Sequence, residues 1–533
     1  MGTPTVSRPE LFRPPLDYPR MPYDRMLADT ARRVPENVAV VSGDVSLTYR
    51  ELEALTNRFA RALARLGVRT GDRVCLLTPN CPEYVVAFYA IARVGAVVSP
   101  MNPSYREREI EYQLGDTEAV ALVVHRSLLP LVEGVRNRAP ALRHVIAVGA
   151  ADARPANAHG FAELVAAEPP SPPPAADAGE DGLVALPYSS GTTGLPKGVM
   201  LSHRNLVTNN VQFVATVRLR EIDRLMIFLP LYHIYGAMLM GGAVLAGATS
   251  VLMERFEPTV CMQLVQRHGV TCFFAVPPVL LALASWPRLG DYDFSSVRFT
   301  LVGAAPVPPE LSRRFGELTG APVLQGYGMT EASPITHLNP VHDPSLIGLD
   351  SAGLPVHDTE QKVVDLETGK RTLGPGEVGE ICIRGPQIMQ GYWRAPEATA
   401  AALRGGWYHS GDIGYVDERG YVFIQDRKKE MIKYKGLGIA PAEIEALLLE
   451  HPAVADAAVI GVSHPEAGEV PKAFVVRRPG HDALDADAVA SFVRGRLAAY
   501  KTPGAVEFVE TIPRTPSGKI LRRILKERER PAP

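Results

Sequence analysis

The segment Tyr188–Val199 places the strongest constraint on what this chain can fold into. The apolar run Leu183–Pro187 just before it predicts a short buried strand that leads straight into a loop. Hydroxyl side chains and two glycines fill Ser189–Gly194, and Lys197 follows. Glycines let backbone N–H groups turn toward an anion, hydroxyls add donors, and a lysine adds positive charge. The segment therefore predicts a loop that holds the phosphates of a nucleotide.

This loop differs from the other common phosphate-binding loop. The Walker A loop needs Gly-Lys-Ser/Thr leading into a helix, whereas here Pro196 precedes the lysine and Gly198 follows it. A plain surface loop rich in glycine and threonine would have the same composition, so the residues alone leave that alternative open.

Length and composition narrow the class of protein. The 533 residues exceed what one hydrophobic core usually supports, so we expect two or more domains. The 56 Lys and Arg nearly balance the 58 Asp and Glu, which gives no basic excess to suggest nucleic acid. Five scattered cysteines without a Cys-x-x-Cys pair predict neither a disulfide framework nor a zinc knuckle. The N-terminus lacks an apolar signal sequence and the C-terminus a peroxisomal address, so we predict a cytoplasmic enzyme.

The uncharged segment Leu225–Met253 is long enough to span a membrane. Pro230, His233 and several glycines interrupt it, and ordinary mixed charge flanks it on both sides. These interruptions favour a buried strand and helix of a globular core, so we expect no integral membrane segment.

Helical and strand patterns alternate in the first part of the chain. They predict a helix over Tyr49–Leu66, a strand over Arg73–Thr78, a helix over Tyr84–Val94 and a strand over Ala96–Ser99. Such alternation indicates an α/β fold with parallel strands and helices on both faces. The Pro- and Ala-rich tract Ala166–Asp181 is typical of a solvated connector.

Six further motifs follow the phosphate loop in order. They are Leu229–Gly236, Val302–Pro306, Leu324–Ser333, Trp407–Asp412, Asp426–Gly436 and Pro513–Lys519. Together with the loop they resemble the adenylate-forming superfamily, which includes acyl-CoA and aryl-CoA ligases, firefly luciferase and the adenylation domains of peptide synthetases. From about Tyr23 to Leu525 the chain is similar to 4-coumarate-CoA ligases and bacterial acyl-CoA synthetases.

The resemblance implies a division into two domains. Residues 1–428 would form a large domain of several subdomains, with parallel and mixed sheets flanked by helices. Residues 429–533 would form a small, mobile α+β domain with its hinge at Lys429. The charged run Asp426–Glu430, which in most proteins is only a solvated face, lies at this boundary.

The resemblance also implies the chemistry. A carboxylate would attack the α-phosphorus of ATP to give an acyl-adenylate and pyrophosphate, and both reactants are anions whose charge the site must neutralise. Lys519 would bond the acyl carboxylate and the α-phosphate, Thr330 would contact the α-phosphate, and Glu331 would bind Mg²⁺. By sequence alone, Glu331 could instead be an acid in the first turn of a helix. The β- and γ-phosphates would be held by Ser189, Ser190, Gly191, Thr192, Thr193 and Lys197.

The remaining nucleotide contacts follow from the same motifs. Asp412 would accept hydrogen bonds from both ribose hydroxyls, with Arg427 beside it. The adenine and the adenylate would be flanked by Gln325, Gly326 and Tyr327.

Coenzyme A would accept the acyl group in a second step. The small domain would rotate about its hinge and present a face with Lys433, Lys435 and Gly436, where any side chain at the glycine would block the pantetheine arm. Lys435 and Arg255 would contact CoA. Gly438 stands where the plant enzymes have glutamine, so the balance between the two steps stays open.

The acyl site is the least constrained part. His233 would gate the carboxylate end and Tyr235 would line the pocket, although a lone histidine among apolar residues is more often a core residue. No acid lies near His233 to pair with an ammonium group, so we do not expect an amino-acid substrate. A slot for an aromatic ring or for a medium or long acyl chain would be left by Ala304, Gly326, Pro334 and Ile335.

Three functions remain: a CoA ligase, an adenylating enzyme that loads a carrier protein, and a nucleotide-binding protein without turnover. The presence of Lys197, Glu331 and Lys519 disfavours the third, and the predicted CoA contacts favour the first.

The pattern Pro513-x₄-Gly-Lys519 also resembles the one that lysine acetyltransferases target in related ligases. Acetylation would remove the charge that adenylation needs.

Overall fold

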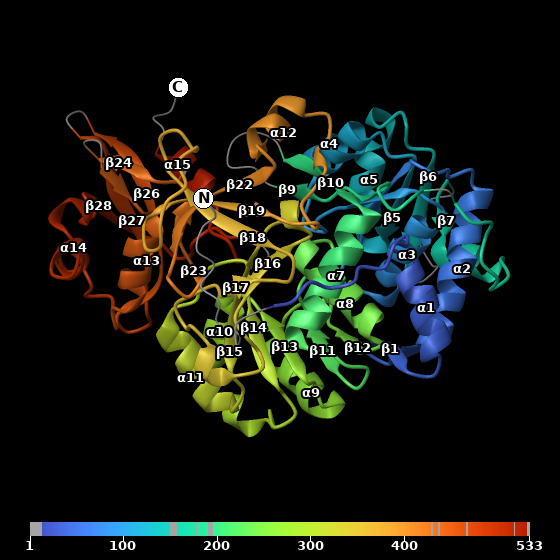
Figure 1. The fold of residues 1–533 in the computed structure, drawn as a ribbon, viewed down its shortest axis with the longest axis horizontal. Coiled ribbons are helices and arrows are strands. Elements are labelled where there is room, and N and C mark those ends of the chain that lie inside the picture. Colours follow the sequence, from blue (N-terminus) through green and yellow to red (C-terminus); the bar gives the residue numbers. More distant parts are fainter. Residues whose placement is uncertain are drawn as a thin grey trace.

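The computed structural model describes residues 13–149, 157–176, 178–189, 196–427, 430–434, 437–464, 467–515 and 518–529. Within them the strands form four sheets. Figure 1 shows the sheet of the early residues on the right, that of the middle residues at the bottom, and that of the last residues on the left. The α/β fold that the sequence predicts is confirmed.

The sheet of the early residues is mostly parallel and carries the predicted phosphate loop at one end. β3 pairs in parallel with β4 and β5, β5 with β6, and β4 with β8, whereas β10 runs antiparallel to β8. In spatial order its strands are β20 (Gly391–Tyr392), β10 (Lys197–Ser202), β8 (Leu183–Ala185), β4 (Val97–Pro100), β3 (Arg73–Leu77), β5 (Ala121–His125), β6 (His144–Val148) and β7 (His159–Gly160), with β9 (Tyr188–Ser189) beside β10.

Helices cover this sheet where the sequence predicts them. The helix expected over Tyr49–Leu66 is present, and it starts with a capping box in which the Thr48 hydroxyl accepts from the Glu51 amide while the Glu51 carboxylate accepts from the Thr48 amide. The helices of this part are α2 (Tyr49–Arg65), α3 (Pro82–Arg93), α4 (Glu107–Thr117), α5 (Leu129–Val135) and α6 (Phe161–Ala166).

The sheet of the middle residues provides the edge near which the candidate residues His233, Tyr235, Ala304 and Gly326 lie. Its central strands β11 to β15 are parallel, so their carboxyl ends meet at one edge. In spatial order its strands are β17 (Leu354–Pro355), β16 (Ile335–Leu338), β15 (Val323–Gly328), β14 (Phe299–Val302), β13 (Cys272–Ala275), β11 (Arg224–Ile227), β12 (Thr249–Leu252), β1 (Val38–Ser42) and β2 (Val45–Thr48). Its helices are α1 (Arg25–Arg33), α7 (His203–Val217), α8 (Ile234–Ala246), α9 (Pro258–His268), α10 (Pro277–Ala284) and α11 (Pro309–Thr319).

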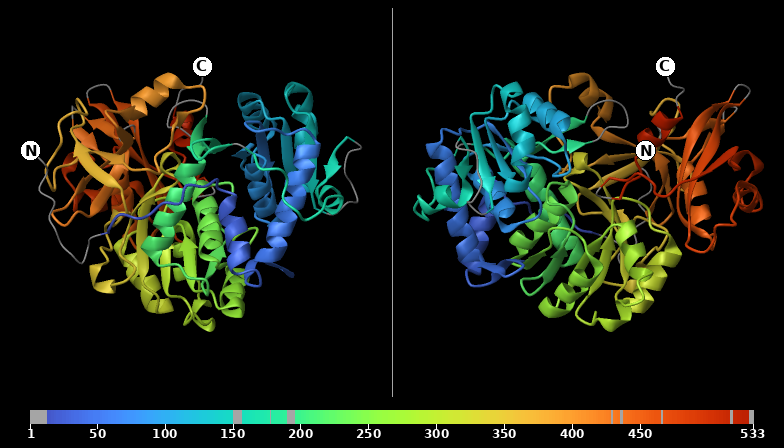
Figure 2. Two further views of the ribbon diagram at one scale, coloured as in Figure 1. Left: turned by 45° about the vertical axis from the view of Figure 1, so that its right-hand side comes forward. Right: turned by 180° about the vertical axis from the view of Figure 1, so that it is seen from behind.

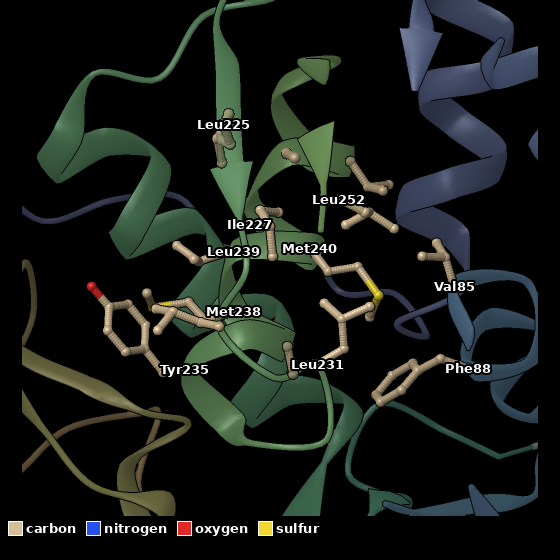
Figure 3. Packing of buried hydrophobic residues seen from close by; sticks show 14 of the residues in the cluster. Val85, Phe88, Leu225, Ile227, Leu231, Tyr235, Met238, Leu239, Met240 and Leu252 are labelled. Carbon is tan, nitrogen blue, oxygen red and sulfur yellow. The ribbon is translucent and has the colours of Figure 1, made fainter. Parts of the chain in front are cut away.

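The uncharged segment forms β11, α8 and β12 inside the molecule, as predicted. Figure 3 shows Met240 of α8 on the side of Val85 of α3, whereas Tyr235 projects in the opposite direction. Among the described residues no helix is both long and apolar enough to cross a membrane.

The last two sheets are smaller and largely antiparallel. One consists of β18 (Glu360–Val364), β19 (Gly379–Arg384), β22 (Trp407–Val416) and β21 (Leu403–Arg404), with β23 (Val422–Arg427) beside β22 and α12 (Pro396–Ala402) nearby. The other consists of β25 (Leu437–Ile439), β24 (Ile432–Tyr434), β27 (Gly468–Arg477) and β26 (Val454–His464), with β28 (Ala505–Phe508) parallel to β27. Helices α13 (Pro441–Leu449), α14 (Ala486–Arg494) and α15 (Arg522–Arg528) accompany this C-terminal sheet, which lies at one end of the molecule (Figure 2). The predicted hinge at Lys429 lies outside the described residues.

Glycines allow α8 to pack closely, which generates a first prediction. A Cβ atom added to Gly241 would lie 2.4 Å from the Tyr23 hydroxyl oxygen and 2.6 Å from the Asn210 amide oxygen. We expect Gly241→Ala to lower the free energy of unfolding by about 1–3 kcal/mol, the usual penalty for overpacking a core. Gly115→Ala in α4 is the matched control, because nothing lies within 4 Å of its added Cβ. This variant should be neutral or stabilising by up to about 1 kcal/mol. Denaturant unfolding measures both, and equal midpoints for the two variants would contradict the packing argument.

Candidate active site

Two residues of α4 fix both ends of the predicted phosphate loop. The Tyr112 hydroxyl donates to the Pro196 carbonyl over 2.8 Å, and the Tyr188 hydroxyl donates to the Asp116 carboxylate. Burial, followed by the hydrogen bond to Asp116, raises the pKa of Tyr188 well above its usual value. Ser189 of β9 pairs with Lys197 of β10, so the two strands that flank the loop lie side by side. The predicted phosphate ligands Ser190, Gly191, Thr192 and Thr193 lie outside the described residues.

Tyr392 contacts both Lys197 and the predicted metal ligand Glu331. The Lys197 Nζ atom is 5.6 Å from the centre of the Tyr392 ring, and the Tyr392 hydroxyl donates to Oε1 of Glu331 over 2.8 Å. Glu331 is buried, with 7% of its surface exposed. Tyr392 is on β20, which pairs with β10 at Val199. The sequence analysis did not predict a role for Tyr392. The sequence feature that could have indicated it is an aromatic residue after a glycine, in Gly391-Tyr-Trp393.

A second group of polar side chains surrounds the predicted ribose ligand. The Tyr327 hydroxyl donates to Oδ2 of Asp412 over 2.5 Å, and Asp412 is 4% exposed. In the backbone pairing of β22 with β23, Asp412 is opposite Arg427. Burial raises the pKa of Tyr408 well above its usual value, and the carboxylates of Glu331 and Asp412 add to this effect. Both carboxylates therefore act electrostatically on Tyr408.

The Gln325 side chain has backbone partners that its motif does not predict. Its side chain is buried and bonded to backbone: Oε1 accepts from the Val307 amide over 3.2 Å, and Nε2 donates to the Leu349 carbonyl over 2.5 Å. Its own carbonyl accepts from the Asn339 amide and side chain. Gln325 thus fixes the strand that carries Gly326 and Tyr327, and its side-chain amide is already occupied.

The predicted acyl residues gather at the carboxyl ends of β14 and β15. A Cβ atom added to Gly303 would lie 3.3 Å from the Tyr235 ring and 3.6 Å from the Gly326 carbonyl oxygen. Ala304 is exposed and has a φ of 72°, a conformation that non-glycine residues rarely adopt. The predicted slot residues Pro334 and Ile335 are buried instead, and Asn209 bonds both the amide and the carbonyl of Ile335.

His233 serves first as a helix cap. Its Nδ1 atom accepts from the Tyr235 amide at the start of α8, and burial lowers the pKa of His233 to about 4, so the ring is neutral at pH 7. The ring also lines a small cavity of about 30 Å³ that Thr330 and Tyr188 share. The histidine is therefore both structural and adjacent to the predicted α-phosphate ligand.

Lys519 lies in a loop that its own domain holds tightly. The Thr515 amide donates to the Lys519 carbonyl and the Lys519 amide to the Thr515 hydroxyl. Arg514 donates to the Gly518 carbonyl over 2.8 Å and pairs with Asp456 over 2.6 Å. Lys519 lies in a loop, as predicted, but its side chain is half-buried, whereas the sequence predicted an exposed loop.

The burial of this loop comes from the middle part of the chain. A Cβ atom added to Gly518 would lie 2.9 Å from the ring of Pro278 at the start of α10. α10 follows β13, so the Lys519 loop lies against the sheet edge that also carries Gly303 and Gly326.

The predicted CoA contacts are only partly described. Arg255 and Lys433 are exposed, and neither lies in the groups above. Lys429, Lys435 and Gly436 lie outside the described residues.

Comparisons with known proteins identify the family. Residues 27–393 match the family described as AMP-binding enzyme, and residues 443–519 match the AMP-binding enzyme C-terminal domain. The chain is 42% identical to 4-coumarate–CoA ligase 5 of Oryza sativa subsp. japonica over 491 residues, which cover 90% of this chain and 89% of that enzyme. It is 41% identical to 4-coumarate–CoA ligase 3 of Arabidopsis thaliana, with 90% and 86% covered.

Solved structures are similar over nearly the whole chain. An anthranilate CoA ligase in complex with anthranoyl-AMP superimposes with a TM-score of 0.89 at 30% identity, and the match covers 96% of this chain and 98% of that one. ATP-bound MatB from Rhodopseudomonas palustris gives a TM-score of 0.86 at 31% identity, with 95% and 99% covered. The chain therefore belongs to the AMP-binding enzyme family, whose CoA ligases use ATP and CoA, and it is an AMP-forming acid–thiol ligase that makes acyl-CoA.

Proposed function

We propose that this ligase activates an aryl carboxylic acid in two steps, with Mg²⁺ in the first. The observation that carries the proposal is that the Tyr392 hydroxyl joins the region of Lys197 to the buried carboxylate of Glu331, while Tyr327 orients the buried carboxylate of Asp412. These residues supply a cation for phosphate, a carboxylate for a metal ion and an acceptor for a diol, as a nucleoside triphosphate requires.

In the first step the acid's carboxylate oxygen forms a bond to the α-phosphorus, and the bond from that phosphorus to the pyrophosphate oxygen breaks. Lys519 stabilises the charge that develops on the carboxylate and the α-phosphate, and no proton has to move. Lys197 neutralises the outer phosphates, together with the loop residues from Ser189 to Thr193. Thr330 contacts the α-phosphate, next to the neutral ring of His233.

Glu331 fits the preference of Mg²⁺, which proteins usually bind through one or two carboxylates together with substrate phosphates. Tyr392 fixes one of its oxygens, so the carboxylate has a defined orientation. Bound Mg²⁺ would neutralise charge on the pyrophosphate. Among the described residues there is no cluster of three or more His, Cys, Asp or Glu that could hold a metal without the nucleotide.

In the second step the CoA thiol releases its proton, its sulfur bonds to the acyl carbon, the bond from that carbon to the phosphate oxygen breaks, and AMP leaves. For this step we propose that residues 429–533 rotate as a unit about Lys429, withdraw Lys519 and present Lys433, Lys435 and Gly436. The exposure of Arg255 and Lys433 supports a contact with a highly charged cosubstrate such as CoA. Cytoplasmic location stays a prediction, and a carrier protein remains the alternative acceptor.

The acyl site supports an aryl acid. Tyr235 is buried, its hydroxyl bonds the Leu301 carbonyl, and a Cβ atom added to Gly303 would lie 3.3 Å from its ring, so an aromatic side chain and a glycine stand together at this site. The 4-coumarate–CoA ligases and the anthranilate CoA ligase named above act on coumarate and anthranilate, which are aromatic acids.

A panel of acids tests the substrate class and the acceptor. With ATP, Mg²⁺ and CoA, aryl acids should give AMP and aryl-CoA with kcat/KM at least about tenfold above that for fatty acids. Without CoA the enzyme should release pyrophosphate once and then stop. Liquid chromatography with mass spectrometry measures the products. Preference for long fatty acids would refute the aryl slot, and adenylation without any thioester would favour the carrier-protein alternative.

Two variants separate the half-reactions. Lys519→Ala should slow adenylation by about two orders of magnitude or more, the scale for removing a transition-state donor, and should spare thioester formation from supplied acyl-AMP. Gly436→Trp should do the reverse. Lys526→Ala in α15 is the control that removes another lysine near the C-terminus. Equal loss of both steps in both variants would refute rotation of the small domain.

A lysine acetyltransferase is a proposed partner. Because Lys519 is half-buried in the described arrangement, acetylation should be faster when no acid or ATP holds the domains together. Mass spectrometry gives the stoichiometry at Lys519, and pyrophosphate release gives the activity. Full acetylation at Lys519 should abolish adenylation, and a deacetylase should restore it. Undiminished adenylation after full acetylation would refute both this switch and the catalytic role of Lys519.

A further inference from the structure

The strand that carries Asp412 is irregular just before this residue. In the antiparallel pairing of β19 with β22, Glu380 is opposite Ile413 and Cys382 is opposite His409. Ile381 alone therefore faces the stretch Ser410–Asp412, which makes a bulge in β22. A bulge changes the direction of the side chains next to it, and here the affected side chain is that of Asp412, the proposed ribose ligand.

Two side chains hold the bulge. The Glu380 carboxylate accepts from the Gly411 amide over 3.2 Å through Oε1, and Gly411 has a φ of 71°. The Ser410 hydroxyl donates to the Ile381 carbonyl over 2.7 Å and accepts from the Asp412 amide over 3.0 Å. The backbone amides of Gly411 and Asp412 thus both donate to side chains.

Glu380 is itself fixed in place. It is 4% exposed, and Oε2 lies 3.7 Å from Nη2 of Arg404 and 3.5 Å from Nδ1 of His409. Burial and the nearby guanidinium lower the pKa of His409, so its ring is neutral and Nδ1 accepts from Arg404 over 2.7 Å. Arg404 is therefore the cation that faces the buried carboxylate, while its outer side reaches solvent.

The Asp412 carboxylate is oriented from its other side by Tyr327. The described contacts that orient Asp412 thus act both on its carboxylate, through Tyr327, and on the backbone that carries it, through Ser410 and Glu380.

We infer that Glu380 is a positioning residue that sets the enzyme's discrimination between ribose and 2′-deoxyribose nucleotides, through the Gly411 amide and Asp412. The inference rests on the proposed role of Asp412 as the ribose ligand. Without Glu380 the bulge can relax, and Asp412 then meets the 2′-hydroxyl at a wrong distance or angle. ATP can lose the contacts of both its ribose hydroxyls, whereas 2′-deoxy-ATP can lose only that of its 3′-hydroxyl.

The test compares kcat/KM for ATP and for 2′-deoxy-ATP in pyrophosphate release. Glu380→Ala should raise KM for ATP about tenfold or more, the usual effect of losing a hydrogen bond to a charged group, and change kcat much less. The ratio of the two kcat/KM values should fall toward 1. This ratio does not depend on how much of the enzyme is folded, so general destabilisation alone leaves it unchanged.

Three further variants complete the experiment. Ser410→Ala removes the other brace of the bulge without removing a buried charge, and it should lower the ratio in the same direction. Glu360→Ala removes a carboxylate of the neighbouring strand β18 that pairs with Arg384 at the surface, and it should leave the ratio at the wild-type value. Asp412→Ala sets the ratio expected when the ribose contact is lost.

The outcomes are distinct. A ratio that falls in Glu380→Ala and Ser410→Ala, as in Asp412→Ala, supports the inference. A ratio that falls only in Asp412→Ala overturns the role of Glu380 and leaves the proposed function intact. An unchanged ratio in Asp412→Ala overturns the ribose contact itself, and with it the basis of the inference.

Discussion

The antiparallel pairing of β10 with β20 is the contact on which the proposed nucleotide site depends. It joins a strand that starts at Lys197 to a dipeptide almost 200 residues later, and it puts Tyr392 between that lysine and Glu331. The phosphate loop and the Glu331 carboxylate belong to separate sheets, and Tyr392 bridges them. Asp412 comes from β22 of a third sheet, and its carboxylate accepts from Tyr327 of β15.

Local patterns were enough to predict the α/β fold, the helix over Tyr49–Leu66 and the buried nature of the segment Leu225–Met253. These features depend on hydrophobic periodicity and on short-range capping, which the sequence contains directly. Tyr392 and Glu380 could not be predicted in the same way. Each acts through a contact with a residue distant in the chain, and only the register of β20 against β10 and of β19 against β22 defines that contact.

Two predicted residues have contacts that their motifs alone do not show. Gln325 was expected to flank the adenine, and its side chain bonds the backbone at Val307 and Leu349. Lys519 was expected on an exposed loop, but it is half-buried, and the neighbouring Gly518 lies close to Pro278. Composition indicates that a loop is present, whereas burial depends on which surface the loop meets, and that surface is built from another part of the chain.

The hydrogen bonds described for the Lys519 loop come from residues of the C-terminal part itself, chiefly Arg514 with its partner Asp456. Contacts within the C-terminal part therefore hold the described backbone of this loop, and its Gly518 lies close to Pro278 of the middle part. A part that carries its own reactive group in a fixed geometry can be exchanged as a module. Recombination between related ligases at the boundary before β24 should accordingly transfer the lysine together with its geometry, while acid selectivity stays with the residues that line the acyl pocket.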